Sequence, residues 1–222
     1  MNTIKSSSFA YALRLPVHAF LITMLFLESG LTSNSSAQEK PQNEPKLYRL
    51  DPPPAPKTGV RADFLAEIAY YEQRYMELAK VIPAEKYAWR PTDGTRTFGE
   101  ILAHVTVMNT FSQRSLEEPL KPGVTYGFSN ERVEKGTMAL ANDKEKLLPQ
   151  LKLSFSSLRQ QVLLMNDADA EAHKLVFGRH TTMRGGFFLI TQNLGEHLGQ
   201  LIAYARMNGV TPPWSQEAAH KQ

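Results

Sequence analysis

Two histidines on the apolar faces of helix-forming segments are the residues of this chain best suited to do chemistry. His104 follows Ile101 by three positions in one segment, and His197 lies between Leu194 and Leu201 in another. A neutral imidazole in such a place can bind a divalent metal ion through a ring nitrogen. It can also be a hydrogen-bonded residue of the core, which is the commoner role of a histidine on an apolar helix face. The residues alone leave both interpretations open.

The composition excludes several other kinds of active centre. The 222-residue chain has no cysteine, which rules out disulfides, thiolate ligands and a cysteine nucleophile. It also has no Gly-rich phosphate loop, no G-x-S-x-G elbow and no H-E-x-x-H motif. Any metal would therefore need histidine, carboxylate or amide ligands. The net charge is only +3 and no basic run is interleaved with aromatic residues, so we expect no nucleic-acid partner.

The first 37 residues have the pattern of a secretory signal peptide. Lys5 and Arg14 precede an apolar run over residues 15–27, and small residues follow up to Ala37. A basic start, a short apolar stretch and a small-residue cleavage site are typical of export. The run is shorter than the roughly 20 apolar residues of a membrane span, although an uncleaved N-terminal anchor is the alternative. We expect a periplasmic or secreted protein with no stable membrane anchor after cleavage.

Behind this segment the sequence predicts one all-α domain. Residues 38–58 are rich in proline and have little to bury, which is typical of an extended linker. In residues 59–214, apolar side chains recur at alternating steps of three and four in amphipathic segments. That spacing is typical of bundle helices, and four such segments predict a four-helix bundle with long crossover loops. Residues 215–222 read as a polar tail.

Local signals indicate where these helices begin and end. Pro83 should end the first helix, because a proline cannot continue it. Thr97 and Glu100 have the spacing of a capping box, which starts the second helix. Pro149 indicates that the third helix either begins there or bends there. Gly209 is expected to stop the fourth helix.

The loops between the helices contain two histidines and a tryptophan, each of which could have a structural or a functional role. Residues 117–141 read as a crossover loop with room for a short helix, and residues 166–183 as a loop with a short extended piece at 175–177. His173 and His180 in the second loop are interpreted as surface or loop-packing residues, with a third metal ligand as the alternative. Trp89 is interpreted as an anchor that closes the end of the bundle, with substrate contact as the alternative.

Three stretches together resemble the DinB-like superfamily of bacterial helical-bundle proteins, also described as YfiT-like metal-dependent hydrolases. They span residues 84–91, 97–105 and 193–213, and their order and spacing are specific to that family. The resemblance extends over residues 59–214. It implies a bundle that holds a divalent ion of the zinc or nickel type between its helices and acts on a small-molecule substrate. It also implies a homodimer, since related bundles often pair.

The resemblance places the metal ligands of the family at His104, Asn193 and His197. Metal-binding members usually carry H-x-x-x-H on the last helix, whereas this chain has Asn193 four positions before its final helical histidine. A carboxamide binds through a neutral oxygen and suits hard ions better than zinc or nickel, so the ion would be held weakly or has been lost. Glu100 could supplement the set unless the capping box uses it. Gln200 either orients a ligand or bonds to another helix.

Two functions follow from these observations. The first is an exported DinB-like enzyme, a metal-dependent hydrolase or thiol-type transferase that acts on a small molecule. The second is a metal-free bundle that binds a small ligand or associates with itself in the periplasm. Export favours the hydrolase over the transferase, because low-molecular-weight thiols are mainly cytoplasmic. The two functions differ in whether the purified protein contains metal.

Overall fold

The computed structural model of the chain describes residues 53–117 and 131–215. The expected signal peptide, most of the proline-rich linker and the polar tail beyond residue 215, with His220, lie outside the described residues. Residues 53–58, the described end of the linker, contain no helix or strand before the first helix begins. Among the described residues, no helix combines the length and the apolar character that crossing a membrane requires.

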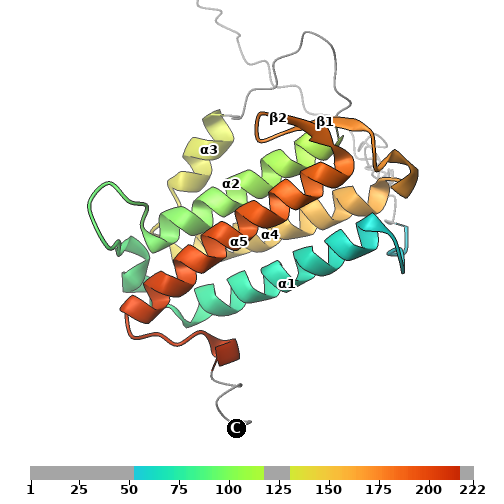
Figure 1. Ribbon diagram of the computed structural model, residues 1–222. Helices are drawn as coiled ribbons and strands as arrows, with labels where there is room; N and C mark the ends of the chain where they lie inside the picture. The colour runs from blue at the N-terminus through green and yellow to red at the C-terminus, as the bar shows by residue number, and fades with distance from the viewer. Residues whose placement is uncertain (1–52, 118–130, 216–222) are drawn as a thin grey trace, which may run out of the picture. The chain divides into compact units, whose positions relative to one another are not determined.

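Four long helices lie side by side in a bundle (Figure 1). They are α1 (Val60–Val81), α2 (Phe98–Glu117), α4 (Lys144–Leu164) and α5 (Met183–Met207). Helix α2 packs against α4 and α5, and α1 packs against the same two helices. The helices therefore form a ring in which α2 and α5 are neighbours, and the predicted four-helix bundle is confirmed.

The core lies between these four helices and contains large side chains from each of them. These are Ile68, Tyr75 and Leu78 of α1, Ile101 and Leu102 of α2, Leu147, Leu151, Phe155 and Leu158 of α4, and Leu201 of α5. Burying one such side chain stabilises the fold by about 1.5–3 kcal/mol. The polar end of Tyr75 is satisfied as well, because its hydroxyl donates to the carbonyl of Leu194 at 2.7 Å.

The capping box at the start of α2 is confirmed atom by atom. The backbone N–H of Glu100 donates to Thr97 Oγ1 at 3.1 Å, and the backbone N–H of Thr97 donates to Glu100 Oε2 at 2.7 Å. The predicted ends are confirmed too. Helix α1 ends at Val81, before Pro83, and Gly209 follows α5 with a φ of +74°. Its backbone N–H donates to the carbonyl of Arg206 at 3.0 Å.

The prediction that the third long helix could begin at Pro149 is wrong. Helix α4 begins at Lys144, and Asp143 caps it by accepting a hydrogen bond from the backbone N–H of Lys146 at 3.1 Å. An aspartate at this position satisfies one of the free N–H groups of the first turn, which starts the helix ahead of the proline. Pro149 then stands inside the helix on its exposed side. The alternative, a bend at that residue, stays a prediction.

The connections between the long helices contain short pieces of regular structure, including a short helix within residues 117–141, for which the sequence left room. A short helix, α3 (Glu131–Met138), follows residues 118–130, which lie outside the described part. A single turn of 3₁₀ helix, η1 (Ala84–Ala88), follows α1, and another, η2 (Asp167–Asp169), follows α4.

The extended piece expected at residues 175–177 is one strand of a hairpin. Strand β1 (His173–Val176) pairs in antiparallel fashion with β2 (Arg179–Thr182). The two residues between the strands, Phe177 and Gly178, both have positive φ, as a type I′ turn requires. The hairpin packs on one end of the bundle, where an added Cβ on Gly186 of α5 would lie 2.9 Å from the side chain of Val176.

Candidate functional site

The two histidines singled out from the sequence face each other across the α2–α5 interface. The ring centroids of His104 on α2 and His197 on α5 are 4.8 Å apart, and the ring planes stand at 83° to each other. Both residues are half-buried. Since α2 and α5 are neighbours in the bundle, the pair is held by two rigid elements and not by a loop.

Burial keeps both rings neutral at pH 7. Burial, with the nearby charges of Arg96 and His197, lowers the pKa of His104 to about 4. Burial also lowers the pKa of His197, while its contact with Gln200 acts in the opposite direction. A neutral imidazole keeps one ring nitrogen with a free lone pair, which is the form that binds a metal ion or accepts a proton.

A row of polar contacts continues from the histidine pair along α5. His197 Nδ1 lies 3.3 Å from Gln200 Oε1, and Gln200 Nε2 donates to the hydroxyl of Tyr204 at 3.1 Å. Both partners of Gln200 belong to its own helix, so the alternative that it bonds to another helix is wrong within the described part of the chain. The Tyr204 ring packs edge to face against the ring of half-buried Trp89, with 5.3 Å between the ring centroids. Trp89 thus packs against the end of the row as an aromatic anchor.

Asn193 and Glu100 contribute differently from the histidines. Asn193 is half-buried on α5, four residues before His197 and therefore on the same face of the helix. Its side chain makes no hydrogen bond with the described residues. The Glu100 carboxylate is engaged by the capping box, and Oε2 also lies 3.6 Å from Nη2 of Arg90. The Glu100 carboxylate therefore stabilises the start of α2 and is not available as a metal ligand.

The donor set fits a divalent ion in part. Two imidazoles bound to one zinc at about 2.1 Å place their ring centroids roughly 5 Å apart, which the His104–His197 pair matches. Within residues 53–117 and 131–215, however, no three His, Asp or Glu side chains come together as a metal site. Asn193, one turn before His197 on α5, is the candidate for a third protein donor, and its amide is a weak one for zinc.

His173 and His180 are not brought to the pair. Both are exposed on the hairpin, which is tied to the far end of α2 by a hydrogen bond of 2.5 Å from Lys174 Nζ to the Leu116 carbonyl. Leu116 is twelve residues beyond His104, and a helix rises by about 1.5 Å per residue, so roughly 18 Å separates the two positions. Neither hairpin histidine can supply a third ligand across that distance.

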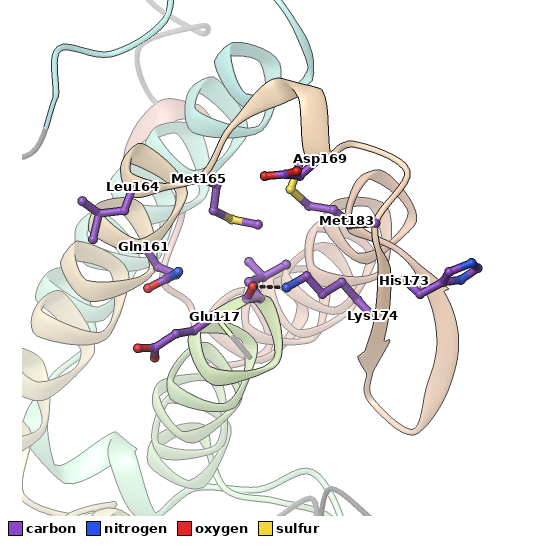
Figure 2. A pocket seen from close by; sticks show the side chains of 10 residues that line it. Glu117, Gln161, Leu164, Met165, Asp169, His173, Lys174 and Met183 are labelled. Atoms are coloured by element: carbon purple, nitrogen blue, oxygen red, sulfur yellow. Dashed lines mark hydrogen bonds between the residues drawn. The ribbon is translucent and has the colours of Figure 1, made fainter. Parts of the chain in front are cut away.

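Sequence reasoning missed Lys174, which lies at this far end beside a hollow of about 520 Å³. Its side chain is directed at the carbonyl end of α2, while the His173 ring points away from it (Figure 2). Burial lowers the pKa of Lys174, against the opposite effect of Asp169. The inward residues of β1, Lys174 and Val176, alternate as in any half-buried strand, which was the available signal. Lys174 thus donates to a carbonyl in the last described turn of α2.

Comparison with known proteins places the chain in a family. No curated protein matches it. Among solved structures, it is similar to the crystal structure of a DinB-like protein from Bacillus cereus ATCC 10987. The two share 17% sequence identity with a TM-score of 0.45, over 68% of this chain and 93% of that one. The sequence model of the DinB superfamily matches residues 68–201, more than half of the chain, a range that includes the histidine pair and Asn193. The chain therefore belongs to the DinB superfamily.

Proposed function

We propose that this protein is an exported metal-dependent enzyme that acts on a small molecule as a hydrolase or thiol-type transferase. His104 and His197 would hold the ion, with Asn193 as a weaker third ligand. A divalent ion supplies Lewis acidity, which activates a water or a thiol at neutral pH. The observation that supports the proposal most is the distance of 4.8 Å between the ring centroids of His104 on α2 and His197 on α5.

Three features of the chain support this assignment. The rings are neutral at pH 7, so binding an ion displaces no proton from a charged imidazole. Their half-buried position limits the access of water and strengthens electrostatic interactions with a bound group. The two ligands also come from different helices, as in other metal sites built inside helical bundles.

The test is the metal content and the EDTA response of the protein purified without chelators. We expect close to one divalent ion per chain by elemental mass spectrometry, and a melting temperature that falls when EDTA removes the ion. His104→Ala should lose the ion and the EDTA response together. A metal-free protein whose melting temperature is the same with and without EDTA would rule the proposal out.

A second function is favoured by Asn193, which replaces the usual histidine of the family. Without a strong third ligand, the same half-buried pair would act as a polar recess that binds a small ligand through neutral ring nitrogens. In that case the wild-type protein contains no metal, and His104→Ala changes its melting temperature equally with and without EDTA.

A further inference from the structure

We propose that Gln200 is a positioning residue, which holds the His197 ring so that its Nε2 lone pair is available to the metal ion. Tyr204 in turn holds Gln200. This inference rests on the proposed function, because it assigns His197 the role of a ligand. Gln200 is not itself a ligand. It acts on His197 through the hydrogen-bonded row His197–Gln200–Tyr204.

The contact between Gln200 and His197 joins an amide oxygen to a ring nitrogen. Gln200 Oε1 lies 3.3 Å from His197 Nδ1, and an amide oxygen can only accept a hydrogen bond. With the amide in this orientation, the contact is a hydrogen bond when the proton of the neutral ring is on Nδ1, and that is the tautomer we assign to His197. Nε2 at the other edge of the ring then carries the lone pair, which is the form a ligating histidine needs.

The Gln200 amide is held in place by Tyr204. Its Nε2 donates to the Tyr204 hydroxyl at 3.1 Å, so the amide bridges two side chains of the same helix. The Tyr204 side chain is only 6% exposed and packs edge to face against Trp89, which leaves it little freedom to move. Because α5 is regular here, positions 197, 200 and 204 share one face and the row needs no distortion of the backbone.

The Gln200 amide differs from that of Gln192, the other glutamine of α5, in its exposure to water. Gln192 Nε2 also bonds to a side chain one turn away, Glu196 Oε1 at 3.1 Å, but that pair is exposed to water. Water can replace a lost partner there at little cost. At half-buried Gln200, the loss of either partner leaves a polar group poorly paired with water. That cost favours the conformation in which both hydrogen bonds of Gln200 are made.

The test begins with nitrogen NMR of the histidine side chains in the metal-free protein. We expect His197 to carry its proton on Nδ1 in the wild type. In Gln200→Leu the proton should move to Nε2, since the protonated nitrogen is set by the hydrogen bond that the ring makes. Gln200→Glu should restore the Nδ1 proton, because a carboxylate also accepts. The matched control Gln192→Leu should leave the His197 signals unchanged.

The second measurement is zinc affinity in the same variants. Partners that orient a ligating histidine are worth 10–100-fold in metal affinity, so Gln200→Leu should bind zinc more weakly by that factor while Gln200→Glu and Gln192→Leu do not. A wild-type His197 protonated on Nε2 overturns the inference whether or not zinc binds. If zinc binds to no variant while the NMR results hold, the proposed function fails and the positioning of His197 by Gln200 stands.

Discussion

At the scale of single residues, the candidate site depends on two rings that must both be uncharged. His104 and His197 have their centroids 4.8 Å apart, and Arg96 adds a positive charge nearby. Protonating either ring would place a second cation in this half-buried region. The same arrangement that favours metal binding therefore makes the metal-free protein sensitive to acid.

The first prediction concerns this acid sensitivity. The pKa of His104 falls from its ordinary value of 6.5 to about 4 in the folded state. Between these two values the unfolded chain binds more protons than the folded one, so the free energy of unfolding decreases as the pH is lowered from 6.5 towards 4. Thermal melts in EDTA should show a larger fall of the melting temperature for the wild type than for His104→Gln. Parallel curves for the two proteins would contradict this.

The second prediction concerns Asn193. Replacing it with histidine gives α5 two imidazoles one turn apart on the face that carries His197. Asn193→His should strengthen zinc binding about tenfold or more, which is about 1.4 kcal/mol. Competition with a coloured chelator measures the change. Gln192→His, at an exposed position of the same helix, is the control and should have no effect. Equal affinities for Asn193→His and the wild type would mean that position 193 does not face the ion.

At the scale of elements, the site depends on where α2 begins. Gly99, in the first turn of α2, passes so close to another segment that an added Cβ would lie 1.8 Å from the Ala141 carbonyl oxygen. That neighbour is backbone, which cannot move aside as a flexible side chain could. The contact fixes the first turn of α2, five residues before His104.

A pair of glycine substitutions tests this contact. Gly99→Ala should lower the free energy of unfolding by about 1–3 kcal/mol, the usual cost of overpacking, and weaken any metal binding with it. Gly199→Ala is the matched control, because nothing lies within 4 Å of its added Cβ. In a helix interior it should raise the free energy of unfolding by about 0.5–1 kcal/mol. Urea unfolding measures both, and equal effects would show that the Ala141 contact is unimportant.

Elements that depend on residues close together in the sequence were predicted well. Elements that depend on contacts between distant parts of the chain were not. The seam spacing, the capping box of Thr97 and Glu100, and the stop at Gly209 each depend on residues within two helical turns. Strand β2 was missed because it is stabilised by pairing with β1 and by packing on α5. The approach of His104 to His197 follows from their apolar faces, whereas the partners of Gln200 depend on which rotamer the packed bundle allows.

At the scale of the whole molecule, the ring of four helices makes the two histidine-bearing helices neighbours although His104 and His197 are far apart in sequence. The hairpin and its hollow lie at the opposite end, so the two regions can be altered separately. The proposed periplasmic or secreted location rests on residues 1–37 alone.

The prediction for export is a mature chain that begins at Gln38. Expression of the full sequence in a bacterium should release into the periplasm a protein whose N-terminal residues start there, because the small residues up to Ala37 have the pattern of a cleavage site. Mass spectrometry of the periplasmic fraction measures the start. An intact chain that stays in the membrane fraction would support the uncleaved anchor instead.

The most direct measurement for the whole account is an anomalous diffraction map of crystals grown with zinc. We expect one ion between α2 and α5, with a ring nitrogen of His104 and Nε2 of His197 both at about 2.0–2.1 Å from it. His104→Ala crystals treated in the same way should show no peak there. Zinc bound only at the exposed histidines of the hairpin, with the half-buried rings of His104 and His197 left unligated, would contradict the metal assignment.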